Sequence, residues 1–257
     1  MYKGNRDTES YKPLKWYRTL ASAKGRVEAG CFLIEGDKAI SQIMAGHSGS
    51  IVEILTVKNL ADEYKKYAVR YLTERQFKSI CVSKTPQGPL AVLKIPDGID
   101  SENLPNNVGE RVLLLEDIQD PGNVGSLIRS AVAFGYSGVV MSDKCADPFS
   151  PKCVQSTAGA VLSPWIRRTA SYMSVVQELK ARAYTIVATA LNGDNPASVL
   201  KGIGKIVLAL GNEADGLSEE MLDLSDYRCK ISIDRVRIDS LNVAACGAIC
   251  MYINSAK

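Results

Sequence analysis

Apolar and polar residues follow one another in short blocks that predict alternating strands and helices. The clearest unit begins with four apolar residues at 112–115, and a run of this kind bounded by polar residues predicts a strand buried in a parallel sheet. An acidic turn with Pro and Gly follows at 116–122. Apolar residues then recur at helical spacing, so we expect a helix that is capped by Asn123 and stops at Gly135. Arg129 falls outside the apolar face of that helix.

The rest of the chain repeats this alternation on both sides of the central unit. In front of it, the pattern predicts strand 32–35, helix 37–45, strand 51–56, helix 60–72, strand 80–82 and strand 89–94. Behind it, we expect strand 138–141, a short helix containing Ser156 and Gly159, helix 174–183, strand 185–190, strand 205–210 and a last helix capped by Asp239 or Ser240. The alternation predicts an α/β fold.

The composition changes between 95 and 109, where Pro, Gly and Asn replace the apolar blocks, and this is typical of a connection between domains. We therefore expect three parts: a small N-terminal α/β domain at 1–98, a linker at 99–109, and a C-terminal domain with a parallel sheet at 110–257.

The apolar run 205–210 leads directly into a loop of unusual composition. Gly211 and Gly216 flank the acidic Glu213, and glycines of this kind let the backbone come close to a ligand. In a parallel sheet this loop and the turn at 116–122 lie at the carboxyl edge, where such sheets bind ligands. We favour a functional loop over a plain turn between a strand and a helix. The small Ala, Cys and Gly residues at 243–250 would let a neighbouring helix pack very closely.

The first 26 residues are strongly basic, with seven Lys and Arg against two Asp and Glu, and aromatic residues lie between them. Basic side chains neutralise phosphates and aromatic rings stack on bases, so this segment is a candidate for binding RNA. The candidate contacts are Lys15, Arg18, Lys24 and Arg26. An amphipathic helix that is anchored by Trp16 and Leu20 and carries solvated charges explains the pattern equally well.

The positions of the cysteines and the single histidine argue against several kinds of catalytic and metal site. The seven cysteines are scattered and form no CxxC pair, which indicates reduced thiols and a cytoplasmic protein. His47 is the one histidine in the chain, so we expect neither a histidine-based triad nor a metal site. No apolar run approaches 18 residues, and we expect no membrane partner.

Three stretches form a combined motif: Asn123-x-Gly125 with Arg129 downstream, GNEADGLS at 211–218, and SLNV at 240–243. The segment DPFSPKCVQSTAGA at 147–160 accompanies them. Together they resemble the SpoU/TrmH family of the SPOUT superfamily, which methylates ribose 2'-hydroxyls of structured RNA. Residues 12–94, with FLIEG and TPQGPLAV, resemble the ribosomal-protein-like substrate-binding domain that often precedes this fold.

The resemblance implies a fold, a cofactor and an assembly. Family members tie the end of the sheet domain, here roughly 208–257, into a trefoil knot, bind S-adenosyl-L-methionine in the knot and act as homodimers. The implied cofactor-binding residues are Leu210, Gly211, Asn212, Glu213, Gly216, Ile231, Ile233, Leu241 and Asn242. The implied catalytic residues are Arg129, Asn123, Glu213, Ser240 and Asn242. Ribosomal RNA is favoured over transfer RNA as the partner, because the front domain resembles a ribosomal protein.

Transfer of a methyl group to a hydroxyl is an in-line displacement, so positioning supplies much of the catalysis. Because a guanidinium stays protonated, Arg129 suits an orienting or charge-stabilising role better than that of a base. The plainer interpretations are an exposed helix arginine at Arg129 and a structural cap at Asn242.

The chain also departs from the family pattern. The segment 231–239 lacks the usual proline and glycine, Ala244 replaces a serine, and Gln155 stands where an arginine is common. Arg235 and Arg237 in that segment are therefore available to bind RNA. The rival hypotheses are an RNA-binding protein with a degenerate cofactor pocket, a tRNA 2'-O-methyltransferase, and an oxidoreductase, which the lack of GxGxxG after a strand disfavours.

Overall fold

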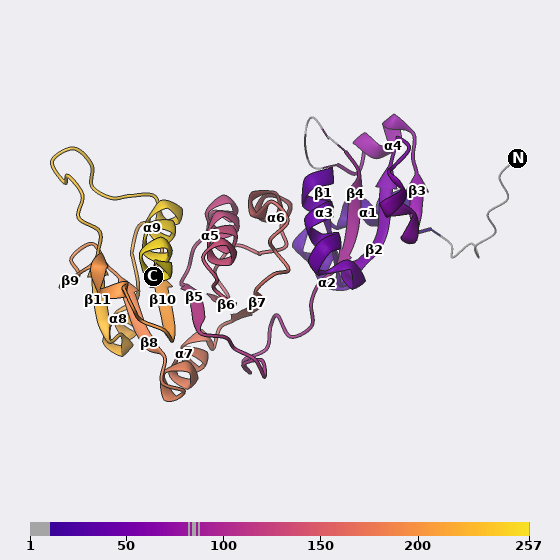
Figure 1. Ribbon diagram of the computed structural model, residues 1–257. Helices are drawn as coiled ribbons and strands as arrows, with labels where there is room; N and C mark the ends of the chain where they lie inside the picture. The colour runs from indigo at the N-terminus through magenta and orange to yellow at the C-terminus, as the bar shows by residue number, and fades with distance from the viewer. Residues whose placement is uncertain (1–10, 82, 84–85, 87, 257) are drawn as a thin grey trace, which may run out of the picture.

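The structure is a computed structural model that describes residues 11–81, 83, 86 and 88–256. Among these residues two sheets form, one in each half of the chain (Figure 1). The N-terminal unit consists of α1 (Leu14–Thr19), α2 (Ala23–Ala29), β1 (Cys31–Glu35), α3 (Asp37–Gly46), the 3₁₀ helix η1 (Ser48–Ser50), β2 (Ile51–Thr56), the 3₁₀ helix η2 (Asp62–Lys66), β3 (Val69–Tyr71), α4 (Glu74–Lys78) and β4 (Leu90–Lys94).

The C-terminal unit continues the alternation. Its elements are β5 (Arg111–Leu115), α5 (Pro121–Ala133), β6 (Gly138–Ser142), α6 (Pro151–Thr157), β7 (Trp165–Thr169), α7 (Tyr172–Ala181), β8 (Thr185–Thr189), β9 (Asn195–Pro196), the 3₁₀ helix η3 (Ala197–Leu200), β10 (Ile206–Leu210), α8 (Glu219–Leu224), β11 (Tyr227–Lys230) and α9 (Val243–Ser255). The mixed α/β class predicted from the sequence is confirmed.

The N-terminal sheet has the strand order β1-β4-β2-β3, in which β4 is antiparallel to β1 and β2, and β3 is parallel to β2. The predicted helix at 60–72 is wrong, because its second half pairs with β2 as an edge strand, in the register Ile54↔Val69. Its first half turns as η2 and buries Tyr64. The strand predicted at 80–82 is not formed at Ile80, whose amide donates to Phe77 O in the turn that ends α4; Val82 lies outside the described residues.

The C-terminal sheet is parallel throughout, in the order β7-β6-β5-β10-β8-β11-β9. The strands β5 and β10 are neighbours, with Leu210 opposite Leu115, so the loops that follow them leave the sheet side by side. This arrangement follows the prediction that both loops lie at the carboxyl edge. The strand β7 was missed, because its sequence WIRRT is too polar for a buried run, and the two-residue β9 was missed as well.

Helices cover both faces of this sheet. Leu113, Leu208 and Leu210 pack toward α5 and α9, whereas Val112 and Leu114 pack toward α7 and α8. A Cβ at Gly247 of α9 would lie 2.4 Å from Leu127 Cδ2 and 2.7 Å from Leu210 Cδ1. The predicted close packing of the small-residue helix is therefore confirmed. None of the described helices combines the length and the hydrophobicity needed to cross a bilayer.

Both predicted helix caps need correction. The helix α5 begins at Pro121, and Asp120 is its N-cap, since its side chain accepts from the amides of Gly122 and Asn123. Proline fits the first helical position because its missing N–H needs no partner there. The helix α9 begins at Val243, and its N-cap is Asn242 instead of Asp239 or Ser240.

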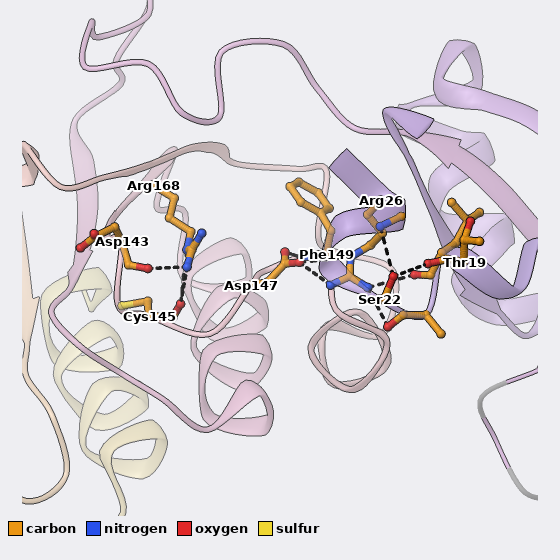
Figure 2. Close-up of polar contacts among 11 residues, drawn as sticks. Thr19, Ser22, Arg26, Asp143, Cys145, Asp147, Phe149 and Arg168 are labelled. Atoms are coloured by element: carbon orange, nitrogen blue, oxygen red, sulfur yellow. Dashed lines mark hydrogen bonds and ion pairs between the residues drawn. The ribbon is translucent and has the colours of Figure 1, made fainter. Parts of the chain in front are cut away.

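The two units pack against each other through a polar and an apolar contact. Figure 2 shows Arg26 of α2 reaching Asp147, whose Oδ2 accepts from the arginine Nη2 at 2.5 Å and from Nε at 3.1 Å. Beside this pair, the rings of Phe32 and Phe149 lie with centroids 4.9 Å apart. Figure 2 also shows Arg168 of β7 donating to the carbonyls of the same loop, with a distance of 3.0 Å to Cys145 O. The loop between β6 and α6 is thus held from both sides.

The segment predicted as a linker is attached to the edge of the C-terminal sheet. Ile99 O accepts from Arg168 N at 2.7 Å, Asn103 O from Arg167 Nε at 2.7 Å, and Val108 O from Trp165 Nε1 at 2.9 Å. All three donors belong to β7. Residues 99–109 therefore connect the two units without hanging free of them.

Candidate functional site

A cavity of about 480 Å³ opens at the carboxyl edge of the parallel sheet. Its walls come from β8 and β11, from the loops that follow β8, β10 and β11, and from α8 and α9. The sequence-predicted cofactor residues that line it are Gly211, Asn212, Glu213, Gly216, Ile231, Ile233 and Leu241, and Ser240 lines it too. Leu210 is fully buried beneath the cavity, and Asn242 stands beside it without lining it.

The loop after β10 is held in one shape by its own backbone. The amide of Asn212 donates to Gly216 O, and the amide of Gly216 donates back to Asn212 O, at 3.0 and 2.9 Å. Gly216 has a positive φ of 75°, which other residues rarely adopt, and a Cβ at Gly211 would lie 2.2 Å from the carbonyl carbon of Gly216. The two glycines that the sequence singled out are therefore required by conformation and by space.

The side chain of Asn212 fixes this loop to the turn after β5. Its Nδ2 donates to Asp117 O at 2.8 Å, and its Oδ1 accepts from Ala214 N at 2.8 Å. Asp117 is itself a residue with positive φ, of 56°. The two loops at the carboxyl edge thus form one hydrogen-bonded surface.

A chain of three polar side chains joins the three motif stretches. Asn123 Nδ2 on α5 donates to Glu213 Oε1 at 2.6 Å, and Asn242 Nδ2 donates to Asn123 Oδ1 at 3.0 Å. Glu213 comes from the loop after β10, and Asn242 stands at the start of α9. Residues that are 90 and 119 positions apart are therefore brought together.

Asn242 also has a structural task, because its Oδ1 accepts from the amides of Ala244 and Ala245 at 2.9 and 3.3 Å. The structural-cap interpretation left open by the sequence is thus observed together with the contact to Asn123. We had expected Asn242 to be buried early in the last helix, but its side chain is exposed.

Arg129 lies on the exposed side of α5, six residues beyond Asn123. Six residues of helix correspond to about 9 Å along the axis. Within the described part of the chain, its guanidinium takes part in no hydrogen bond or ion pair. Its five donors are therefore available to a polyanion.

Glu116 is a residue of this edge that the sequence did not single out. It is 5% exposed, its Oε2 accepts from Ser218 N at 3.0 Å, and its Oε1 accepts from the Tyr172 hydroxyl at 2.5 Å. Burial and the bond to Glu116 raise the pKa of Tyr172. The signal that the sequence offered was a carboxylate directly after a buried strand. In the structure, Glu116 joins the end of β5 to the start of α8.

Three thiols form one wall of the cavity. Cys229 belongs to β11, and Cys246 and Cys250 lie one turn apart on α9. Hydrogen bonding to its two neighbours, together with burial, raises the pKa of Cys250. Among the described residues, no group of three or more His, Cys, Asp or Glu is arranged to hold a metal ion.

The basic residues of the N-terminal unit separate into two groups. Lys15, Arg18 and Lys24 are exposed, although Arg18 Nε donates to Ser79 O at 3.1 Å and Lys24 lies 3.8 Å from Glu28. The expectation for Arg26 needs correction, because this side chain is 3% exposed and is fully engaged within the protein. Its Nη1 donates to Leu20 O and Ala21 O, and its other nitrogens donate to Asp147 (Figure 2).

Comparisons with known proteins point to one family. Residues 110–252 match the SpoU rRNA Methylase family, and residues 12–91 match an MRM3-like substrate binding domain. The chain is 32% identical over 244 residues to the 23S rRNA (guanosine(2553)-2'-O)-methyltransferase RlmP of Bacillus subtilis (strain 168), a match that covers 93% of this chain and 94% of that protein.

Two further proteins extend the comparison. The chain is 28% identical over 254 residues to the 23S rRNA (uridine(2479)-2'-O)-methyltransferase of Streptomyces viridochromogenes, covering 93% of this chain and 87% of that protein. The crystal structure of an AdoMet-bound rRNA methyltransferase from Sinorhizobium meliloti has a TM-score of 0.79 at 27% identity, covering 94% of this chain and 93% of that one.

Proposed function

The chain belongs to the SpoU rRNA methylase family, as its motifs predict, and we propose that it transfers a methyl group from S-adenosylmethionine to a ribose 2'-hydroxyl of ribosomal RNA. The observation that carries this proposal is the meeting of Asn123, Glu213 and Asn242 beside the 480 Å³ cavity. Each of the three residues belongs to one of the three motif stretches.

The cavity residues fit the cofactor. Gly211 brings the backbone of the loop after β10 to the cavity wall, and the apolar Leu217, Ile231, Leu241 and Val243 offer a surface for a purine ring. When bound, S-adenosylmethionine supplies an electrophilic methyl group on a sulfonium. The volume also argues against a degenerate pocket, since the altered segment 231–239 leaves the space open.

Asn123, Glu213 and Asn242 orient the reacting groups, because their mutual hydrogen bonds hold α5, the loop after β10 and α9 at fixed separations. Ser240 stands at the cavity beside them. Arg129 lies on the same helix as Asn123 and binds the phosphate next to the target ribose, and it stabilises negative charge that develops on the attacking oxygen. Positioning of this kind supplies catalysis by converting a bimolecular encounter into an oriented one.

The N-terminal unit binds the RNA substrate through Lys15, Arg18 and Lys24, which extend from α1 and α2 into solvent. We assign residues 1–98 to this domain, 99–109 to the connection and 110–257 to the methyltransferase domain. Ribosomal RNA is the favoured substrate over transfer RNA, because the two relatives compared over nearly the whole chain act on 23S rRNA.

Assembly and location complete the proposal. A homodimer would cover the apolar side chains that α9 exposes, Ile249 at 39% and Tyr252 at 62% exposure, with Phe134 beside Tyr252. A trefoil knot would arise where the chain after β10 passes through the loop that precedes it. The seven free cysteines suit the reducing cytoplasm.

The test begins with calorimetric titrations of the purified protein with S-adenosylmethionine, S-adenosylhomocysteine and NAD. Saturable binding of the first two, followed by transfer of labelled methyl groups into ribosomal RNA, is the expected result. Methyl groups should be recovered as 2'-O-methylribose. RNA binding without any affinity for S-adenosylmethionine would overturn the proposal and favour a non-enzymatic RNA-binding role.

A further inference from the structure

The segment 231–242 connects β11 to α9 and contributes to the rim of the cavity. Its Arg235 contacts the loop on another wall of the same cavity. Arg235 Nη1 donates to Asn192 Oδ1 at 3.0 Å, and its Nη2 donates to Leu191 O. Both acceptors belong to the loop that follows β8, 43 and 44 positions earlier in the chain. The guanidinium thus bonds the segment to a separate part of the structure.

The two parts that Arg235 joins lie on different walls of the same cavity. Leu191 and Asn192 line it from the loop after β8, and Ile231 and Ile233 line it from the segment after β11. A bond between these walls fixes the width of the cavity at its rim.

The loop after β8 is a firm attachment point. Ala190 N donates to Cys229 O at 2.9 Å, which ties the loop to β11. A Cβ at Gly193 would lie 2.5 Å from Arg228 O, so the turn is pressed against the neighbouring strand. The segment after β11 forms no helix or strand before α9, its residues 234–240 are exposed, and the backbone hydrogen bonds that Asp234 accepts come from within the segment itself.

We propose that Arg235 is a positioning residue that latches the segment 231–242 over the cofactor cavity; this inference rests on the function proposed above. Within the segment, Asp234 closes a local turn by accepting from the amides of Val236, Arg237 and Ile238. The planar guanidinium of Arg235 ties this turn to the loop after β8, because it offers two parallel donors to two oxygens. By holding the segment, Arg235 keeps Ile231 and Ile233 in place against the bound cofactor.

The neighbouring Arg237 is a matched control. Its Nε lies 3.3 Å from Asp234 Oδ2 within the same segment, and its side chain is 87% exposed. It carries the same charge and stands two positions away, but its ion pair stays on one side of the cavity. Loss of Arg237 therefore changes the net charge without opening the latch.

The experiment compares Arg235→Ala, Arg235→Lys and Arg237→Ala with the unchanged protein. The first readout is amide hydrogen exchange of residues 231–242 in the cofactor-free protein, which does not depend on any activity. The second is the Kd for S-adenosylmethionine by calorimetry, and the third is the separation of KM for the cofactor from kcat.

Arg235→Ala should accelerate exchange across the segment and weaken cofactor binding about ten-fold, the effect of losing two hydrogen bonds. KM for the cofactor should rise while kcat stays near its original value. Arg235→Lys, which keeps one donor at a time, should fall between these two results, and Arg237→Ala should match the unchanged protein in hydrogen exchange and in the Kd for S-adenosylmethionine.

Equal exchange in Arg235→Ala and the unchanged protein would overturn the latch, as would an equal loss of affinity in Arg237→Ala. If the unchanged protein bound no S-adenosylmethionine, the proposed function would fail on its own. The exchange comparison would then still decide whether Arg235 holds the segment.

Discussion

The polar chain beside the cavity makes a specific prediction for Asn123→Asp. In the folded protein Asn123 donates to Glu213 at 2.6 Å and accepts from Asn242 at 3.0 Å. The aspartate keeps the acceptor for Asn242 but removes the donor, so two carboxylates then face each other. The substitution therefore breaks one link of the chain and adds repulsion at the same place.

The size of the effect follows from these contacts. A hydrogen bond to a charged group contributes about 1.5 to 3 kcal/mol, and two unit charges 4 Å apart repel by about 1 kcal/mol in water. Because Glu213 is exposed, solvent weakens both the hydrogen bond and the repulsion, so the low end of the hydrogen-bond range applies. We therefore expect a loss of about 2 kcal/mol in the free energy of unfolding. For a unit of this size that corresponds to a decrease in Tm of about 4 to 8 °C.

The assay is thermal unfolding of the cofactor-free protein, with the double variant Asn123→Asp/Glu213→Gln as the decisive comparison. In the double variant, the amide of the new glutamine donates to the new aspartate, and Asn242 still donates to it as well. Tm should therefore recover most of the loss. A double variant as unstable as the sum of its two single variants would refute the hydrogen-bonded chain as the cause.

Three further predictions concern catalysis, RNA and the thiols. Arg129→Ala should abolish methylation of the correct RNA and leave the calorimetric Kd for S-adenosylmethionine unchanged; a parallel loss of cofactor binding would contradict its assigned role. Replacing Lys15, Arg18 and Lys24 by Gln should weaken RNA binding and reduce the slope of log K against log salt by about one for each lost phosphate contact, and an unchanged slope would return α1 and α2 to a solvated surface. Cys246, which is partly exposed on the cavity wall, should be alkylated before the buried thiols beside it, and S-adenosylhomocysteine should protect it in a mass-spectrometric time course; alkylation at the same rate with and without the ligand would place the ligand elsewhere.

The buried parallel strands were predictable because their sequences are continuous apolar runs. Residues 206–210 are fully buried, and so are 112–115, and no other structure suits such short runs between polar turns. The edge strand β7 escaped, since Arg167 and Arg168 interrupt its apolar pattern. Edge strands depend on their neighbours more than on composition, which also explains how β3 was mistaken for part of a helix.

Helix starts were misplaced where more than one capping residue stands before the helix. Asp120 and Asn123 are both good caps, and the proline directly after Asp120 was the deciding signal, because proline favours the first position of a helix. At α9, Asp239, Ser240 and Asn242 all precede the apolar run, and local sequence offers no preference among them. The contact of Asn242 with Asn123 settles the start, and that contact exists only in the folded protein.

For the candidate site, the sequence offers candidate residues but not their contacts. The motif pattern pointed to Asn123, Glu213 and Asn242 as separate positions, and the structure adds that Asn123 bonds to both of the others. Glu116 went unnoticed because a single buried carboxylate has no periodic signature. Its partners Ser218 and Tyr172 lie 102 and 56 positions away, beyond the reach of any local pattern.

The partner of Arg26 is also too distant in sequence to be predicted from a local pattern. The contact it makes bears on whether the two units move relative to each other. A charged residue is rarely buried unless it is paired, and its partner Asp147 is 121 positions distant. Separating the units would hydrate both charges of this pair, so the pair itself contributes little, but each large apolar side chain exposed to water costs about 1.5 to 3 kcal/mol. Separating the units would break the Arg26 pair and expose Phe32 and Phe149. The Pro- and Gly-rich composition of 95–109 therefore does not make it a hinge, because the contacts on either side of it hold the units together.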